Sequence, residues 1–215
     1  MKLYYHTWRH LIRGAAPILT SLTITGREHI PATGPAILVS NHVSMVDPIW
    51  TMGYVKRQVF FMYKVELTEH FPLKYLLPPA DPIPIRRGKV DREALRQAEA
   101  VLARGDMLGI YPEGTRSKSA TAQVAQEGAV FLAKRTNAPI LPMAISGTER
   151  MFSSHFPWYR RVPVRMTFGA PFTLQDLAAE VGTDREAQAQ AIMGRVAALL
   201  PPAYRGVYAL ESVSS

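Results

Sequence analysis

The sequence predicts a single α/β domain, in which helices flank a mostly parallel or mixed central sheet, with an amphipathic helix at the N-terminus. Short apolar segments, which are typical of buried strands, alternate along the chain with segments of helical periodicity. The chain has 215 residues and is 47% hydrophobic, which suits one sizeable core better than two domains. We therefore expect a helix over residues 1–24, the α/β domain over 25–205 and a tail over 206–215.

The N-terminal segment has the pattern of an amphipathic helix. Its apolar residues recur at helical spacing, and its cations gather mostly on the other side. The apolar set is Leu3, Tyr4, Trp8, Leu11, Ile12, Ala15, Ile18 and Leu19, and the cationic set is Lys2, His6, Arg9, His10 and Arg13. Such a helix suits a membrane interface, with its aromatic residues toward the lipid, and it equally suits packing on its own domain. Pro17 is expected to bend or end it.

The same segment predicts neither a membrane span nor a secretory signal. No apolar run in the chain approaches the roughly 20 residues that a spanning helix needs. Arg9, His10 and Arg13 interrupt the part that a signal peptide would keep apolar. We therefore expect this helix to remain in the mature protein.

The predicted strands are short, apolar and bounded by turn residues. They cover residues 35–40, 58–64, 81–88, 106–112, 138–146 and 162–169. The prolines of the third segment favour a strand at an edge or between loops over a central one.

The predicted helices run from about Ser44 or Pro48 to Gly53 and over residues 68–79, 91–105, 125–136 and 184–201. In the helix over 91–105, Asp91 is suited to cap the start and Gly105 to stop the end. In α/β folds of this kind, functional sites form beyond the carboxyl ends of the strands.

Charge and cysteine content limit the possible chemistry. Lys and Arg total 25 against 17 Asp and Glu, which gives a net charge of +8 and favours anionic partners such as nucleic acid, phosphorylated metabolites or an acidic membrane surface. The absence of cysteine excludes disulfides and thiolate chemistry.

The stretch "SNHVSMVD" over residues 40–47 directly follows a predicted strand. A neutral histidine can remove a proton from an alcohol, and a carboxylate on its other ring nitrogen orients it, so His42 and Asp47 are a candidate general-base pair. On a regular helix these two positions would lie about 140° apart, so they must meet across a turn. The alternative is that Asp47 caps a helix beginning at Pro48 and that His42 is an ordinary loop histidine.

A second polar stretch, "YPEGTRS" over 111–117, also follows a predicted strand. It combines a carboxyl group, a glycine, a hydroxyl and an arginine at a strand-to-helix junction, where backbone N–H groups favour anions. The basic segment "IRRGK" supplies Arg86, Arg87 and Lys89. Taken alone, the first is equally consistent with a capping turn and the second with a solvated basic loop.

In this order the segments resemble the four sequence blocks of the lysophospholipid acyltransferase family. "NHVSMVD" matches the Asn-His-x4-Asp block in full, and "YPEGTRS" matches the third block with Tyr111 in place of phenylalanine. "LPMAI" matches the fourth with Leu141 in place of valine, whereas "PIPIRRG" keeps only the arginine of the second, at Arg87. The matches extend from about residue 36 to 147 in the family's order and spacing.

The resemblance implies an O-acyltransferase that moves a fatty acyl chain from acyl-CoA or acyl carrier protein to the free hydroxyl of a lysophospholipid. The expected acceptor is 1-acyl-sn-glycerol-3-phosphate, which gives phosphatidic acid. Other acceptors, glycerol-3-phosphate or a lyso-aminolipid, and a non-catalytic protein that binds anionic lipid are the alternatives. The reaction needs no cofactor and no metal.

The resemblance also assigns roles by position. His42 is implied as the base and Asp47 as the residue that orients it. The implied substrate-binding residues are Lys64, Arg87, Glu113, Gly114, Thr115, Arg116 and Pro142. Glu113 would hold the glycerol end of the acceptor, Arg87 and Arg116 its phosphate, and Lys64 or backbone N–H groups near Gly114 the oxyanion. Pro142 would shape the acyl-donor side.

Both substrates carry fatty chains, so the resemblance favours a peripheral enzyme at a membrane surface, with the N-terminal helix at the lipid interface. Because the sequence has no signal-peptide pattern, we expect that surface to be the cytoplasmic face of the cell membrane. Two other functions fit the sequence less well. A metal hydrolase would draw its ligands from His42, His70 and His155 with carboxylates, and no two of these three histidines lie close in sequence. A nucleic-acid-binding protein could use the positive charge, but the chain has no recognised binding motif.

Overall fold

The computed structural model describes residues 2–64, 83–85, 91–117, 119–152 and 161–212. Within them the strands are β1 Thr20–Thr25, β2 Ala36–Ser40, β3 Val59–Lys64, β4 Ile83–Ile85, β5 Met107–Ile110, β6 Ile140–Ser146 and β7 Val162–Phe168. The α-helices are α1 Lys2–Leu19, α2 Asp47–Tyr54, α5 Arg92–Ala103, α6 Gly128–Thr136, α7 Leu174–Val181 and α8 Arg185–Ala198. Short 3-10 helices are η1 Arg27–His29, η2 Thr148–Phe152, η3 Pro202–Tyr204 and η4 Gly206–Ser212.

The strands form one seven-stranded mixed sheet in the order β1-β7-β6-β2-β5-β3-β4. The five strands from β6 to β4 pair in parallel, whereas β7 runs antiparallel to β6 and parallel to β1. The predicted fold class is therefore confirmed. Because five neighbouring strands point the same way, their carboxyl ends lie at one edge of the sheet.

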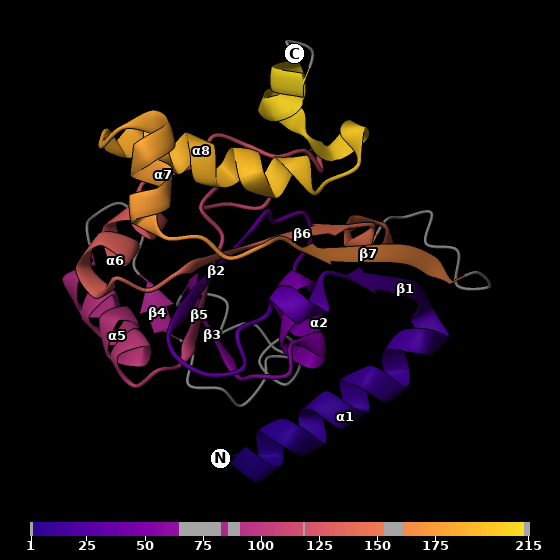
Figure 1. Ribbon diagram of the computed structural model, residues 1–215. Coiled ribbons are helices and arrows are strands. Elements are labelled where there is room, and N and C mark those ends of the chain that lie inside the picture. The colour runs from indigo at the N-terminus through magenta and orange to yellow at the C-terminus, as the bar shows by residue number, and fades with distance from the viewer. Residues whose placement is uncertain (1, 65–82, 86–90, 118, 153–160, 213–215) are drawn as a thin grey trace.

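Helices cover both faces of the sheet (Figure 1). The side chains of Ile37 and Val39 pack with α5, α6 and α8 on one face, and Leu38 packs with α1 and α2 on the other. All five residues of β2 are buried, as expected for a central strand with two covered faces. The near-continuous apolar sequence of this strand follows from that position.

Most predicted elements are present with shifted ends. Helix α5 begins after Asp91, whose carboxylate accepts the N–H of Ala94 at 3.1 Å, and it is followed by Gly105 at φ 78°. β4 is an edge strand paired with β3, as its prolines predicted. The helix predicted over 68–79 lies outside the described residues. Helix α7 was not predicted; it begins at a capping box formed by Thr173 and Asp176.

The boundary predicted for the N-terminal helix was wrong. The helix ends at Leu19, and Thr20–Thr25 form β1, which pairs with β7 along its whole length. Pro17 lacks the N–H that the last turn of a helix would use. The following "TSLTIT" alternates threonine and serine with the partly buried Leu22 and Ile24, which is the period of a strand.

The predicted tail over 206–215 was also wrong for its described part. Gly206–Ser212 form η4, and Tyr208 is 9% exposed and donates a hydrogen bond to Gln190 on α8. The N–H of Val207 donates to the carbonyl of Ala122. One buried aromatic ring thus holds a segment that was predicted to be a tail.

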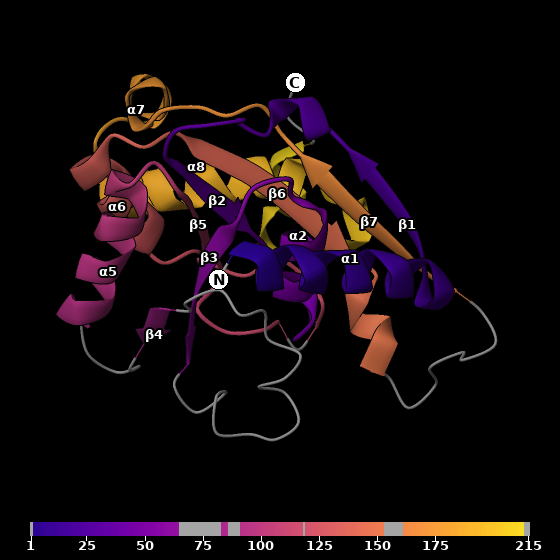
Figure 2. The ribbon, with the colours of Figure 1, turned by 90° about the horizontal axis from the view of Figure 1, so that it is seen from below.

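Helix α1 packs against α2 across the lower face of the molecule (Figure 2). Tyr5 and Trp8 are buried, and a Cβ on Gly53 would lie 2.8 Å from the side chain of Ile12, so the two helices approach closely. Arg9 Nη1 donates to the carbonyl of Lys56, and Arg13 Nε donates to the carbonyl of Gly53, both at 2.8 Å. These cations satisfy carbonyls near the end of α2.

The outer side of α1 is exposed, with His6, Thr7 and His10 in its N-terminal half and mostly apolar residues in its C-terminal half. Leu11 is 67% and Ile18 74% exposed, and Ala15 lies between them at helical spacing. None of the helices in the described part of the chain is long and apolar enough to cross a membrane. The domain therefore takes up the aromatic residues Tyr5 and Trp8 of α1 and leaves an aliphatic stripe, Leu11, Ala15, Ile18 and Leu19, facing outward.

Candidate active site

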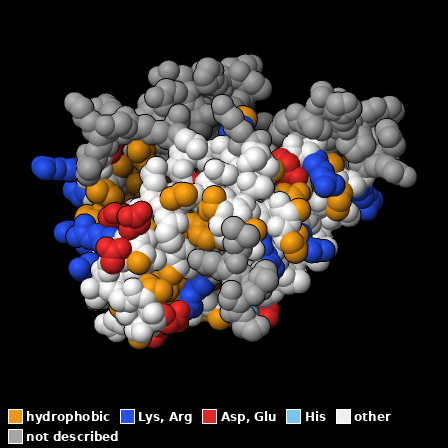
Figure 3. All heavy atoms as spheres, turned by 90° about the horizontal axis from the view of Figure 1, so that it is seen from above, with side chains coloured by type: hydrophobic (Ala, Val, Ile, Leu, Met, Phe, Trp, Pro, Cys, Tyr) orange, Lys and Arg blue, Asp and Glu red, His pale blue; other side chains and the backbone are white. Residues whose placement is uncertain are grey.

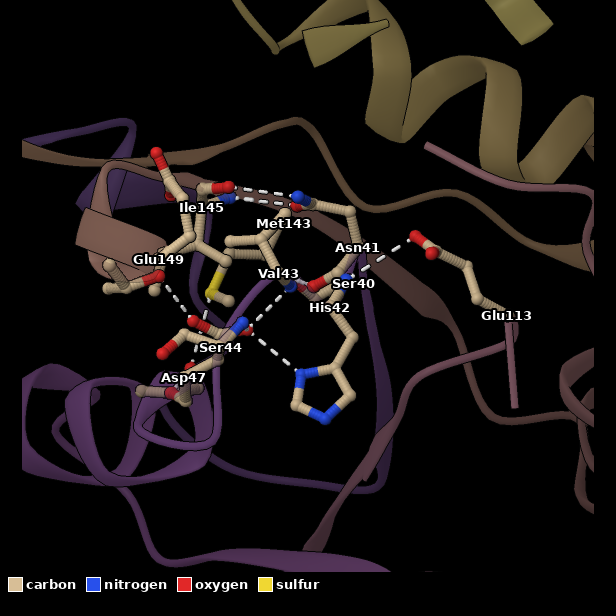
Figure 4. Close-up of polar contacts among 12 residues, drawn as sticks. Ser40, Asn41, His42, Val43, Ser44, Asp47, Glu113, Met143, Ile145 and Glu149 are labelled. Atoms are coloured by element: carbon tan, nitrogen blue, oxygen red, sulfur yellow. Dashed lines mark hydrogen bonds and ion pairs between the residues drawn. The ribbon is translucent and has the colours of Figure 1, made fainter. Parts of the chain in front are cut away.

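The two polar stretches meet at the carboxyl-end edge of the sheet (Figure 4). His42 follows β2, and the segment 111–117 follows β5, the parallel neighbour of β2. Thr148 follows β6, the neighbour of β2 on its other side. Strand order therefore brings together residues that lie about 70 and 100 positions apart.

His42 and Asp47 are in direct contact. His42 Nδ1 lies 2.9 Å from Asp47 Oδ2, with the histidine in the loop after β2 and the aspartate as first residue of α2, so the predicted meeting across a turn is present. The Asp47 side chain is fully buried, whereas that of His42 is 17% exposed. An ionised carboxylate only accepts hydrogen bonds, so Nδ1 carries the proton and Nε2 is the basic nitrogen. Figure 4 shows Nε2 pointing away from Asp47.

Asp47 does not act as a helix cap. Its Oδ2 also accepts the N–H groups of Val43 and Ser44, at 2.8 and 2.7 Å, both of which precede the helix. Its Oδ1 accepts the hydroxyl of Thr148 at 2.5 Å. The carboxylate thus folds the turn back on itself and fixes His42, which contradicts the capping alternative. Thr148 was missed, because only the order of the strands places it here.

Asn41 anchors the start of this turn. Its side-chain amide donates to the carbonyl of Ile145 and accepts the N–H of Ile145, both at 2.9 Å. The side chain therefore extends the β2–β6 ladder by one step beyond the last backbone pair. Asn41 belongs to the matched sequence block but was not predicted as a site residue, and its role here is to set the exit angle of the chain into His42.

The segment 111–117 holds the backbone of His42 from the other side. The N–H of His42 donates to Glu113 Oε1 at 3.3 Å, and the carbonyl of His42 accepts the N–H of Ser117 at 2.9 Å. Both backbone groups of the histidine are thereby satisfied by one loop. The stretch that was predicted to bind substrate therefore also positions His42.

Glu113 is a buried carboxyl group with a free oxygen. It is 6% exposed, and its Oε2 has no hydrogen-bond partner within the described residues. Burial raises the pKa of Glu113 to about 8, against the opposing effect of hydrogen bonds from the backbone of His42 and Gln123. At neutral pH the side chain is therefore mostly protonated, and an Oε2–H group would be a neutral donor to a ligand oxygen.

The neighbours of Glu113 form a tight turn. Gly114 has φ 67°, a left-handed conformation that favours glycine, and a Cβ there would also displace the end of the Gln126 side chain, which would lie 2.8 Å away. Its N–H donates to the carbonyl of Tyr111 at 3.0 Å and is not free to bind an oxyanion. Thr115 and Arg116 follow with exposed side chains.

Three predicted residues are not part of this described cluster. Pro142 is buried inside β6 on the face that it shares with Ile140 and Ala144, away from His42. Lys64 is the last residue of β3, so its backbone lies at the same edge of the sheet. Arg87 lies outside the described residues. In the part of the chain that the structure describes, no three His, Cys, Asp or Glu side chains form a group that could hold a metal ion.

A buried carboxylate bonded to a partly exposed histidine at the carboxyl ends of parallel strands defines an acid–base site on an α/β fold. Residues 21–146, more than half of the chain, match the family model described as Acyltransferase, and the chain belongs to that family. The family predicted from the four sequence blocks is thus confirmed.

Three curated relatives are named 1-acyl-sn-glycerol-3-phosphate acyltransferase. The protein of Borreliella burgdorferi is 29% identical over 140 residues, which cover 61% of this chain and 53% of the relative. The protein of Cocos nucifera is 28% identical over 158 residues, which cover 72% and 51%. That of Bacillus subtilis is 25% identical over 156 residues, which cover 72% and 75%. This chain therefore spans about half the length of the first two relatives.

A solved structure has the same fold. The crystal structure of the 1-acyl-sn-glycerophosphate acyltransferase PlsC from Thermotoga maritima superposes with a TM-score of 0.71 at 22% identity, and the match covers 98% of this chain and 81% of that chain. The mixed sheet and its flanking helices are therefore an arrangement also found in a solved protein.

Proposed function

We propose that this protein is an O-acyltransferase that moves a fatty acyl chain from acyl-CoA or acyl carrier protein to the free hydroxyl of 1-acyl-sn-glycerol-3-phosphate, giving phosphatidic acid. The observation that carries the proposal is the His42–Asp47 contact of 2.9 Å, which leaves Nε2 as the basic nitrogen of a partly exposed histidine, pointing away from Asp47. Membership of the acyltransferase family and the names of the relatives support the same reaction.

The chemistry follows from this geometry. His42 Nε2 removes the proton of the acceptor hydroxyl as its oxygen attacks the thioester carbonyl of the donor. The tetrahedral intermediate collapses, the C–S bond breaks, and the imidazolium returns the proton to the departing thiolate. Asp47 stabilises the imidazolium between these steps. The chain has no cysteine and no Gly-x-Ser-x-Gly elbow, so a direct transfer without an acyl-enzyme fits it best.

The acceptor is recognised beside Glu113. A protonated Glu113 donates from Oε2 to a glycerol oxygen, and because it is neutral it does not repel the phosphate. Arg116, two residues beyond Gly114 and exposed, binds the phosphate with its guanidinium fork. Arg87 and Lys64 complete the proposed site for the phosphate and the oxyanion. The N–H groups of Thr115 and Arg116 are further oxyanion donors, since that of Gly114 is already bonded.

The proposed location is the surface of the cell membrane, on its cytoplasmic face. The supporting observation is the aliphatic stripe of α1, Leu11, Ala15, Ile18 and Leu19, which faces outward. Trp8 and Tyr5 pack into the domain, so the lipid-facing side is aliphatic and not the aromatic side expected from the sequence. On the opposite side of the molecule, the face carrying α7 and α8 mixes hydrophobic side chains with charged side chains of both signs (Figure 3).

Thiol release from palmitoyl-CoA by the purified protein, with and without 1-acyl-sn-glycerol-3-phosphate, tests the proposal. Acceptor-dependent release with phosphatidic acid as the product is the expected result. Parallel reactions with acyl carrier protein as donor, and with glycerol-3-phosphate or a lyso-aminolipid as acceptor, identify other acyltransferase activities. Binding to anionic vesicles without thiol release from any combination would contradict catalysis and leave a lipid-binding protein.

A further inference from the structure

The ring of His42 rests on a column of aromatic rings. Its centroid lies 4.2 Å from that of Tyr111, with 19° between the ring planes. Tyr111 lies 5.2 Å from Phe61 at 11°. A Cβ on Gly109 would lie 2.3 Å from the Phe61 ring, so this glycine in β5 makes room for the column. The three rings come from the neighbouring strands β2, β5 and β3 or the residues that follow them.

We propose that Tyr111 is a positioning residue for the acyl transfer, which fixes the plane of the His42 ring and stabilises its imidazolium form. This inference rests on the proposed function. Asp47 fixes one edge of the imidazole, and Glu113 and Ser117 fix its backbone, but none of these contacts blocks a tilt of the ring about the Nδ1 bond. The ring of Tyr111, which lies nearly parallel to the His42 ring, blocks this tilt.

The stack also favours the charged ring. An aromatic face within about 6 Å attracts a cation, and the imidazolium exists only after His42 has taken the proton of the acceptor. The interaction is therefore stronger in the transition state than in the substrate complex, and it raises kcat with little effect on KM. Asp47 and Glu113 are the titratable groups hydrogen-bonded to His42 within the described residues. Asp47 bonds to Nδ1 at the edge of the ring and Glu113 bonds to the backbone N–H, so neither bonds through the ring face that Tyr111 stacks on.

The Tyr111 hydroxyl is not needed for this role. It is buried beside Thr51 and makes no hydrogen bond of normal geometry to a described residue. Burial and the charge of Asp47 raise the pKa of Tyr111 well above its usual value, so the phenol stays neutral and does not replace His42 as the base. Phenylalanine should therefore preserve the function of the stack, whereas a residue without a ring should not.

The test compares Tyr111→Phe with Tyr111→Leu, and uses Phe60→Leu as the matched control. Phe60 is as buried as Phe61 but faces the helices on the other side of the sheet. We expect Tyr111→Leu to lower kcat about 10- to 100-fold, with KM for both substrates changed less than about threefold, and to move the acid limb of the pH–rate profile about half a unit lower. Tyr111→Phe and Phe60→Leu should keep the kcat of the wild type and the acid limb of its pH–rate profile.

The same comparison is also made in a Glu113→Gln background. The pKa of Glu113, about 8, lies in the measured pH range, and this background ensures that the acid limb of the pH–rate profile does not reflect the titration of Glu113.

An NMR readout is independent of turnover. The ring protons of His42, assigned by their loss in His42→Ala, should be shifted upfield in the wild type and in Tyr111→Phe, and should move downfield in Tyr111→Leu. If Tyr111→Leu does not fold, Tyr111→Met replaces it, because it fills a similar volume without a ring.

An unchanged kcat and unchanged NMR shifts in Tyr111→Leu would overturn the inference. So would an equal loss of kcat in Phe60→Leu, or in Tyr111→Phe. Absence of acceptor-dependent thiol release by the wild type, together with the expected NMR shifts, would contradict the proposed function and leave the ring contact itself established.

Discussion

Asp47 contacts His42 five residues back along the chain and Thr148 101 residues ahead of it. One carboxylate oxygen is bonded by the histidine and by two N–H groups of the turn, and the other by the threonine hydroxyl. The buried charge is therefore satisfied by the turn between β2 and α2 together with the residues after β6. The orientation of the proposed base depends on a contact that closes only in the folded sheet.

Replacing Thr148 with valine removes one of these hydrogen bonds without changing the shape of the side chain much. A buried carboxylate oxygen then lacks a donor, so we expect a loss of about 1.5–3 kcal/mol in the free energy of unfolding. Urea unfolding at neutral pH measures the loss, and kcat should fall about tenfold as Asp47 loses its orientation. The control is Thr25→Val, whose hydroxyl bonds Thr167 at an exposed site and should cost less than about 0.5 kcal/mol.

Glu113→Gln should change how stability depends on pH. Burial raises the pKa of Glu113 to about 8 in the folded protein, above the ordinary value of 4.5. The folded state therefore holds more protons than the unfolded state between these values, and the wild type loses stability as pH rises through this window, by up to about 1.4 kcal/mol per unit. The glutamine of the variant does not titrate, so this loss should disappear.

Urea unfolding of both proteins at about pH 5 and about pH 9 measures this difference. Glu186→Gln, at an exposed position on α8, is the control and should keep the wild-type pH dependence. A wild-type stability that rises between these two pH values would contradict the assignment of a protonated Glu113.

Arg116→Ala should act on substrate binding alone. The side chain is exposed, so its loss should leave stability within about 0.5 kcal/mol of the wild type. Removal of a charged hydrogen-bond donor to the phosphate should raise KM for the acceptor about tenfold or more. Initial-rate kinetics with each substrate varied in turn check this. A rise confined to the KM of the acyl donor would show that the site is divided differently.

Ile18→Glu should weaken binding to anionic vesicles. Ile18 is 74% exposed on the outer side of α1, so the change inserts a negative charge into the proposed lipid-facing stripe without disturbing the core. Vesicle cosedimentation measures binding, and circular dichroism checks that the fold is retained. Val181→Glu, at an exposed apolar position on α7, is the control. Equal vesicle binding by both variants would exclude this side of α1 as the membrane surface.

Local sequence was sufficient for much of the fold. β2 was predicted because its continuous apolar run reflects burial on both faces of the sheet. α5 was predicted because its apolar residues recur at helical spacing and form one buried stripe. The end of α1 was misplaced because Leu22 stands at helical spacing from Ile18, although Thr20–Thr25 as a whole alternates as a strand does. The segment over 206–215 was predicted as a tail because the buried position of Tyr208 depends on tertiary contacts, including its hydrogen bond to Gln190 on α8.

The candidate site likewise contains residues that local sequence predicted and residues that depend on tertiary contacts. His42 and Asp47 were predicted from one short stretch, because their contact is made within a single turn. The roles of Asn41 and Thr148 could not be predicted, since both depend on β6 lying beside β2. Pro142 was included through the family resemblance, and the alternation of side chains along β6 turns it to the other face of the sheet.

The central claim is that His42 and Asp47 work as one unit in proton transfer. The most direct test is kcat for thiol release in His42→Ala, Asp47→Asn and the double variant, with thermal melts to confirm folding. We predict a loss of roughly 10³-fold for His42→Ala, a smaller loss for Asp47→Asn, and a double variant no slower than His42→Ala. Losses that multiply in the double variant, or a folded His42→Ala protein with near wild-type turnover, would contradict the account.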